Sequence, residues 1–230
     1  MNDKKQIPLD FSFYENKSFF NYIPGNNIFI IDMLRKAAND PSYNLIFLRG
    51  ESASGKTHLC SAAFDESRKI KLFLDITKIS KITEYQITNI ELLIIDDFDS
   101  IINKSNVEEK IFFLINDLII RKKSIILTSS LEVDKINFKL EDLKSRVCSD
   151  QMLEIQELND LEKISLLKKI AKNRGWQLTD NVSNYILNHF DRDLYFLYNV
   201  IRNIDKESLA EKKKITIPFI KKILYKKNKF

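Results

Sequence analysis

The feature that most constrains the fold of this chain is the stretch Gly50–Thr57, which reads Gly-Glu-Ser-Ala-Ser-Gly-Lys-Thr. It fits the pattern G-x-x-x-x-G-K-[ST] at every fixed position. Glycines let a loop turn sharply and bring its N–H groups close to phosphate oxygens, while the lysine reaches the β- and γ-phosphates and the last hydroxyl reaches Mg²⁺. Only 4 glycines occur in 230 residues, so a chance glycine-rich turn is the weaker explanation.

The flanking segments fit a strand, loop and helix. Residues 44–49, Asn-Leu-Ile-Phe-Leu-Arg, form a short apolar run typical of a buried strand, and residues 57–68 predict a helix. The residues expected to contact a nucleotide in this unit are Gly50, Ser52, Ala53, Ser54, Gly55, Lys56, Thr57 and His58.

The composition is that of an ordinary globular protein, with 44% hydrophobic and 30% charged residues. A net charge of +5 permits a nucleic-acid or acidic partner without requiring one. Cys60 and Cys148 have no metal-ligand or redox spacing, which favours free thiols in a reducing compartment. Because no signal peptide and no apolar run of about 20 residues is present, we expect a cytoplasmic, soluble protein without a membrane partner.

Further patterns predict an α/β domain followed by helices. Strands are expected at 71–75, 92–97, 124–130 and 151–155, with helices at 27–39, 107–121 and 140–147. From residue 159 the strand patterns stop, and three or four helices follow at about 160–174, 180–189, 192–205 and 218–225. Asn159 and Thr179 are predicted N-caps, and Gly175 a C′ residue. The chain should therefore divide into an extended tail (1–15), a nucleotide-binding domain (16–157) and a helical lid domain (158–230).

Two acids end the apolar strand at 92–97. The carboxyl ends of strands are where α/β sheets bind ligands. We expect Asp96 to hold Mg²⁺, directly or through water, and Asp97 to orient or deprotonate an attacking water. Taken alone the pair also fits a polar turn, but the upstream loop favours the site. The next strand ends in three hydroxyls, Thr128-Ser129-Ser130, which either contact a γ-phosphate or water or cap the next turn.

Two segments near the N-terminus each have two explanations. The aromatic turn at 19–25, Phe-Phe-Asn-Tyr-Ile-Pro-Gly, packs either around an adenine ring or into the core. Residues 6–11, Gln-Ile-Pro-Leu-Asp-Phe, form an extended peptide that either docks into a hydrophobic groove on a partner or folds back on its own core.

The order of phosphate loop, Asp-Asp strand, hydroxyl-ended strand and the box Leu143-Lys144-Ser145-Arg146 resembles the AAA+ module of the bacterial replication initiator DnaA, over about residues 16–225. It is closer to the Hda family, the DnaA-related proteins of regulatory inactivation of DnaA. The chain ends after the lid, without the helix-turn-helix domain of DnaA, and residues 214–224 resemble the family's C-terminal helix. The resemblance implies an AAA+ P-loop NTPase with a parallel five-stranded sheet and a small all-helical lid domain.

The resemblance also implies roles for single residues. Gly50, Gly55, Lys56 and Thr57 match Walker A, and Asp96 and Asp97 match Walker B, with Thr57 and Asp96 as Mg²⁺ ligands. Arg146 matches an arginine finger acting in trans; its structural alternative is a helix-end arginine paired with Glu141 or Asp142. The extended peptide at 6–11 resembles the sliding-clamp-binding peptide of this family, which implies clamp contacts by Gln6, Ile7, Pro8, Leu9 and Phe11.

Two sensor positions depart from the DnaA pattern. Ser130 stands where sensor I of DnaA carries an acid, and Tyr195 where the sensor II arginine is expected. Arg192 lies about one helical turn earlier and is the candidate replacement. A missing sensor II argues for at most weak intrinsic ATPase activity.

As a whole the resemblance implies a negative regulator of replication initiation that binds ADP or ATP with Mg²⁺. Its partners would be DnaA and the sliding clamp (the β subunit of DNA polymerase III), with DNA contacted indirectly through the loaded clamp and a homo-oligomer compatible with the fold. One alternative is an AAA+ helicase loader or chaperone acting on a helicase or single-stranded DNA; a clamp-binding tail separates the two. Another alternative is a DnaA-recruiting adaptor in which the nucleotide is only structural. Substitution of Arg146 distinguishes this adaptor from the regulator, because an adaptor would keep its function after the change.

Overall fold

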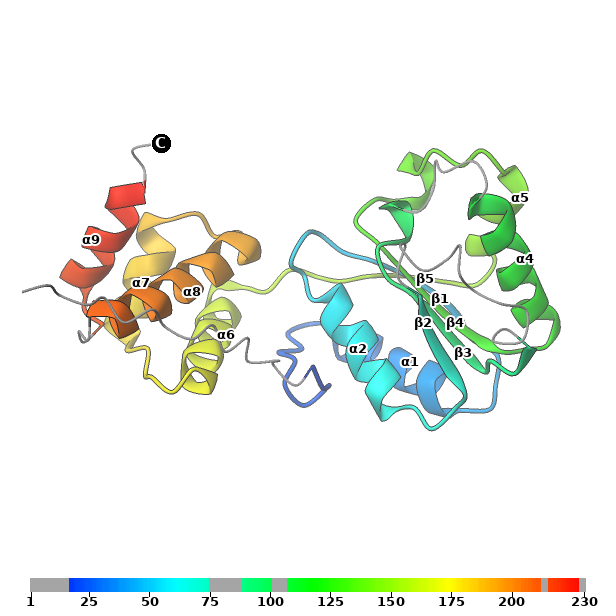
Figure 1. Ribbon diagram of the computed structural model, residues 1–230, viewed down its shortest axis with the longest axis horizontal. Helices are drawn as coiled ribbons and strands as arrows, with labels where there is room; N and C mark the ends of the chain where they lie inside the picture. Colours follow the sequence, from blue (N-terminus) through cyan, green and yellow to red (C-terminus); the bar gives the residue numbers. More distant parts are fainter. Residues whose placement is uncertain (1–16, 75–87, 101–106, 212–214, 228–230) are drawn as a thin grey trace, which may run out of the picture. The chain divides into compact units, whose positions relative to one another are not determined.

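The computed structural model describes residues 17–74, 88–100, 107–211 and 215–227, with side chains to residue 223. These residues form two compact units, divided between Glu157 and Leu158 (Figure 1). The predicted clamp-binding peptide at 6–11 lies outside the described residues.

The first unit is built on a sheet of parallel strands. Within the described residues five strands pair in the order β2-β3-β4-β1-β5. They are β1 (Leu45–Arg49), β2 (Lys71–Leu74), β3 (Leu92–Ile95), β4 (Ser124–Ser129) and β5 (Gln151–Glu154). The expected parallel five-stranded α/β fold is confirmed.

Helices cover both faces of this sheet (Figure 1). The helices are α1 (Ile28–Asn39) and α2 (Lys56–Glu66) on one face, and α4 (Val107–Ile120) and α5 (Glu141–Val147) on the other. Successive residues of a strand point to opposite faces. Leu45 and Phe47 accordingly join the core cluster under α4 and α5, whereas Ile46 and Leu48 join the cluster under α1 and α2. Burial on both faces explains why these strands are continuous apolar runs.

The parallel arrangement brings three connections to one edge of the sheet. The loop after β1, the turn after β3 with its short helix η2 (Phe98–Ser100), and the turn after β4 that leads to η3 (Val133–Lys135) all leave from carboxyl ends. Because β4 lies between β3 and β1, residues that follow β4 have the phosphate loop on one side and the two acids on the other.

The second unit is helical, with α6 (Asp160–Asn173), α7 (Asp180–His189), α8 (Leu194–Glu211) and α9 (Ile217–Lys227). The N-cap predicted at Asn159 is confirmed, since its side chain and Glu162 form a capping box. Gly175 has φ +81° and completes a Schellman motif, in which Trp176 N donates to Ala171 O at 3.1 Å. Thr179 stands at the N-cap of α7 but makes no capping hydrogen bond.

The helix expected at 192–205 is longer in the structure, because α8 continues to Glu211. Neither glycine nor proline interrupts it. Asp205 does not end the helix but forms an ion pair of 3.0 Å with Arg174, which holds α8 to the end of α6. No helix in the described ranges has the length and apolar character needed to cross a membrane.

Candidate nucleotide-binding site

The loop between β1 and α2 turns on two left-handed residues, Ala53 with φ +60° and Gly55 with φ +98°. The sequence pointed to Gly50 and Gly55 as the turning residues, so Ala53 was missed. Glycine is needed at position 50 because a side chain would crowd its neighbours there, and not because its backbone is left-handed. A Cβ atom there would lie 2.5 Å from Ser54 Oγ and 3.2 Å from Ile155 Cβ.

The residues of this loop fit a bound phosphate group. The Ser54 Oγ atom is buried and has no hydrogen-bond partner, which is uncommon for a buried hydroxyl. The N-terminus of α2 is capped by Gly55 without any side-chain acceptor, so its first N–H groups remain available to an anion. A phosphate oxygen at this place would satisfy both the orphan hydroxyl and these donors.

Lys56 places a buried cation inside the loop. Its Nζ donates to Gly50 O at 2.7 Å, to Glu51 O at 3.0 Å and to Ser130 Oγ at 3.1 Å. Burial lowers the pKa of Lys56, while the carboxylates of Asp97, Asp99 and Asp96 oppose that shift. The ammonium group thus lies between the loop and the acids after β3, where phosphate and Mg²⁺ are expected.

Asp96 and Asp97 follow β3 and are held by Thr128 of β4. The Thr128 hydroxyl donates to Asp96 Oδ1 at 2.6 Å and accepts from the Asp97 N–H at 3.0 Å. Asp97 has φ +50°, which is unusual for a residue other than glycine and persists because its surroundings hold it. Burial, and then the charge of Asp96, raise the pKa of Asp97. One hydroxyl therefore holds both the Asp96 carboxylate and the Asp97 backbone.

The other two hydroxyls after β4 have different partners. Ser129 caps the following turn, donating to Leu131 O at 2.8 Å and accepting from Leu131 N at 2.9 Å. Ser130 accepts from Lys56 through its hydroxyl, and its N–H donates to Asp99 Oδ1 at 3.4 Å. Sequence analysis missed Asp99; its position three residues after Asp96, in the same turn, was the available signal.

The acids do not form a complete metal site by themselves. Among the residues that the structure describes, no group of three or more His, Cys, Asp or Glu side chains is placed to hold a metal ion. Mg²⁺ usually combines one or two carboxylates with phosphate oxygens and water. Asp96 together with the hydroxyl of Thr57, which is exposed in the first turn of α2, fits such a partial ligand set.

Removing the Thr128 hydroxyl tests its bridging role. We expect Thr128→Val to lower the free energy of unfolding by about 1–3 kcal/mol, because the partly buried Asp97 N–H loses its acceptor and the Asp96 carboxylate loses a donor. Chemical denaturation measures the change. Ser61→Ala is the control, since its hydroxyl also donates within the domain, to Thr57 O at 2.8 Å, but from an exposed pair. Equal losses in the two variants would contradict a special role for Thr128.

Arg146 lies at the opposite end of the sheet from the phosphate loop. It stands at the end of α5, just before β5 begins at its amino end. Asp150, four residues later, accepts from the Leu45 N–H at 3.1 Å, at the start of β1. Burial and Asp150 raise the pKa of Tyr43, while a hydrogen bond with Ser149 and then the Arg146 charge oppose that shift, in keeping with a guanidinium on this side of the sheet. The length of β1, about 16 Å at 3.3 Å per residue, separates it from Gly50.

The pairing of Arg146 with Glu141 or Asp142 is not observed. The Arg146 side chain is exposed and has no ion pair with any residue in the described part of the chain. The neighbouring Lys144 instead pairs with Asp134, at 2.9 Å.

Two other predicted contact residues have protein partners in the structure. His58 Nε2 is 2.8 Å from Ser18 O. Arg192, in the helical unit, donates to Asp160 Oδ2 at 2.8 Å and to Leu187 O at 3.2 Å, while Tyr195 is 61% exposed. Nucleotide contacts of His58 and Arg192 stay predictions.

Two aromatic residues of the turn at 19–25 have different surroundings. Phe19 is buried in the core under α1 and α2, whereas Tyr22 lies against the phosphate loop.

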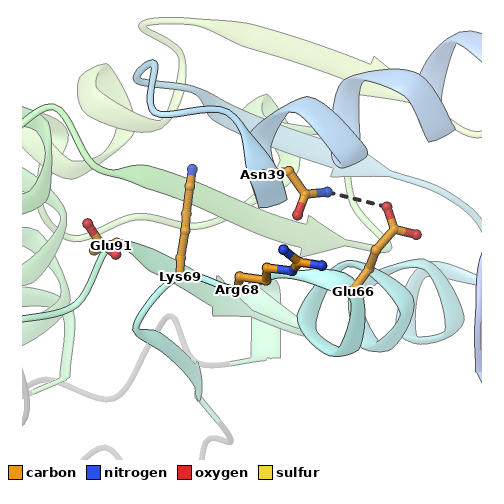
Figure 2. A pocket seen from close by; sticks show the side chains of 5 residues that line it. All are labelled: Asn39, Glu66, Arg68, Lys69 and Glu91. Carbon is orange, nitrogen blue, oxygen red and sulfur yellow. Dashed lines mark hydrogen bonds between the residues drawn. The ribbon is translucent and has the colours of Figure 1, made fainter.

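The pocket drawn in Figure 2 is not this site. Its lining residues come from the ends of α1 and α2 and from the segments that lead into β2 and β3, and enclose about 550 Å³: Asn39, Glu66, Arg68, Lys69 and Glu91. It therefore lies at the amino end of the strands. Asn39 donates to Glu66 at 3.3 Å, Lys69 to Ala37 O at 2.9 Å, and Glu91 pairs with Lys123 at 3.1 Å. Most of its polar groups are thus satisfied by protein.

Comparison with protein-family models matches both units of the chain. Residues 160–224 match the lid domain of Hda, and residues 67–156 match the bacterial DnaA ATPase domain. An uncharacterized protein of Haemophilus influenzae is 31% identical over 227 residues, which cover 96% of this chain and 98% of that protein.

Solved structures with similar folds include replication proteins. Domain III of the Thermotoga maritima replication initiation protein DnaA matches with a TM-score of 0.81 and 20% identity, over 92% of this chain and 97% of that one. AMPPCP-bound DnaA from Aquifex aeolicus matches with a TM-score of 0.71 and 24% identity, over 86% and 68%. The Thermotoga maritima Holliday junction branch migration motor RuvB matches with a TM-score of 0.67 and 17% identity, over 91% and 71%. Each of these matches covers 86% or more of this chain and therefore extends over both of its units.

Proposed function

Because this chain belongs to the DnaA-related AAA+ proteins that carry an Hda lid domain, we propose that it is a negative regulator of chromosomal replication initiation. It binds nucleotide, attaches to the DNA-loaded sliding clamp, and stimulates hydrolysis of the ATP that is bound to DnaA. ATP-bound DnaA then becomes ADP-bound DnaA, which suppresses a second initiation.

The nucleotide is ADP or ATP with Mg²⁺, held by the loop from Gly50 to Thr57. The orphan Ser54 hydroxyl, the free N-terminus of α2 and the buried Lys56 ammonium support phosphate binding there. The AMPPCP-bound DnaA from Aquifex aeolicus, a related fold, supports an adenine nucleotide. Thr57 and Asp96 would hold Mg²⁺, which neutralises phosphate charge. Asp97, with its raised pKa, would orient the attacking water.

The observation that carries the proposal is the position of Arg146. Its guanidinium is exposed and unpaired among the described residues, at the end of the sheet away from its own loop. An arginine finger must reach the transferring phosphoryl group, and a residue at the other end of β1, which is about 16 Å long, is not placed to complete its own site. Such a residue is available to a nucleotide on another protein, and DnaA is the partner we propose.

A reconstituted reaction tests the proposal. DnaA carrying labelled ATP is incubated with this protein, with clamp loaded on DNA, with both, or with neither. We expect rapid loss of ATP only when both are present. Stimulation that does not need the clamp would contradict the proposed tail function, and no stimulation in any mixture would contradict the regulatory role.

The clamp contact is expected to depend on residues 6–11, where Gln6 offers amide hydrogen bonds and Leu9 and Phe11 offer apolar anchors. Changing Gln6, Leu9 and Phe11 together to alanine should abolish co-elution with the clamp. ADP affinity and the unfolding midpoint should stay at their wild-type values, because a short terminal peptide contributes little to a folded core. If the triple variant still co-elutes with the clamp, the assignment of the peptide is wrong.

A further inference from the structure

We infer that Tyr22, which lies outside the phosphate-loop motif, is a positioning residue that holds this loop in its anion-binding conformation. The inference rests on the proposed binding of nucleotide by the loop. Tyr22 contacts the loop twice, through the edge of its ring and through its hydroxyl, and each contact acts on a different part of the backbone.

The ring edge closes the space beside Gly55. A Cβ atom at Gly55 would lie 2.7 Å from Cε2 of Tyr22, well inside van der Waals contact. Gly55 is also the left-handed residue that caps α2. The ring therefore lies against the point where the loop becomes a helix, and it prevents the backbone from shifting outward on that side.

The hydroxyl sets the direction of one peptide group. Tyr22 Oη donates to Ser54 O at 3.3 Å. In a planar trans peptide the C=O and the following N–H point in opposite directions. Holding the Ser54 carbonyl toward Tyr22 thus holds the Gly55 N–H away from it. Phosphate sites of this kind depend on several N–H groups that converge on the anion, so the orientation of this peptide matters for affinity.

Tyr22 is itself fixed by its surroundings. Burial raises the pKa of Tyr22 to about 12, so the hydroxyl stays protonated and able to donate even well above neutral pH. Its ring packs against that of His58 with centroids 5.6 Å apart. His58 in turn is 2.8 Å from Ser18 O, which also accepts from the Tyr22 N–H at 3.2 Å. The turn Ser18–Tyr22 is therefore anchored to α2 next to the loop.

A double-mutant cycle distinguishes positioning from plain core packing. Gly55→Ala adds a methyl group that meets the Tyr22 ring and also strains a left-handed residue, so its ADP affinity should fall by tenfold or more. Tyr22→Leu removes the ring edge but keeps apolar bulk. In the double variant the methyl group no longer meets the ring, so the combined loss should be at least about threefold smaller than the product of the single losses. Calorimetric titration with ADP measures all four proteins.

Tyr22→Phe is the matched variant, because it keeps the ring edge and removes only the hydroxyl. It should weaken ADP binding about two- to tenfold, the range of one neutral hydrogen bond, and should not relieve Gly55→Ala. Phe113→Ala removes an aromatic ring that is 67% exposed on α4 and should leave ADP affinity unchanged.

The outcomes are separable. Additive losses of ADP affinity for Tyr22→Leu and Gly55→Ala would overturn the inference. Wild-type ADP affinity in Tyr22→Phe would also overturn it. If Tyr22→Leu does not fold, the Tyr22→Phe measurement alone is the test. Wild-type protein that does not bind ADP would instead refute the proposed nucleotide site.

Discussion

Replacement of Arg146 by alanine is expected to abolish the stimulation of ATP hydrolysis on DnaA. A guanidinium that neutralises charge on the transferring phosphoryl group contributes roughly 10³–10⁵ in rate. Folding, ADP binding and clamp binding should be nearly unchanged, because the Arg146 side chain is exposed, lacks an ion pair within the described residues and lies far from its own phosphate loop. The measurement is the rate of loss of DnaA-bound ATP in the presence of loaded clamp.

Two further variants sharpen this test. Arg146→Lys should restore little activity, because a point charge lacks the planar fork of guanidinium. Arg68→Ala is the matched control, since Arg68 is also exposed and lies on the same domain between α2 and β2. Undiminished stimulation by Arg146→Ala would remove the finger mechanism and favour the adaptor that only recruits DnaA.

Replacement of Lys56 by methionine is expected to lower ADP affinity by tenfold or more. The variant keeps most of the aliphatic chain and removes the ammonium group, which now has three acceptors around the loop. A hydrogen bond to a charged group is worth about 1.5–3 kcal/mol, and 1.4 kcal/mol corresponds to a factor of ten. Lys56→Ala should weaken binding at least as much. Calorimetry with ADP and Mg²⁺ gives both affinities.

The chain offers a close control for Lys56. Lys69 is also partly buried and donates to Ala37 O at 2.9 Å and to Ser124 Oγ at 3.1 Å, but it lies at the other end of the sheet. Lys69→Met should therefore leave ADP affinity unchanged. Equal affinities in wild type and Lys56→Met would rule out the phosphate-loop assignment, whereas a loss in both variants would indicate a general effect on folding.

Local sequence patterns predicted most of the architecture. Apolar runs and helical periodicity located the described strands and helices to within a few residues, α8 excepted, because burial on a sheet face or a helix stripe leaves a period in the sequence. Asn159 and Gly175 marked the ends of α6, since caps depend on residues one helical turn away. The loop motif and the acids after β3 were visible for the same reason: their spacing is local.

The sequence by itself therefore determined the fold class, and it predicted the phosphate loop and the acids after β3. Tertiary structure alone decided how these parts are held: Thr128 bridges Asp96 and Asp97, and Tyr22 closes the space beside Gly55. It also put Arg146 at the far end of the sheet, because that position follows from the parallel direction of β5 beside β1. These contacts join residues about 30 to 100 positions apart. Contacts between such distant residues produce no periodic pattern in a single sequence. They depend on the order of the strands in the sheet, which is set when both faces of the sheet pack against helices.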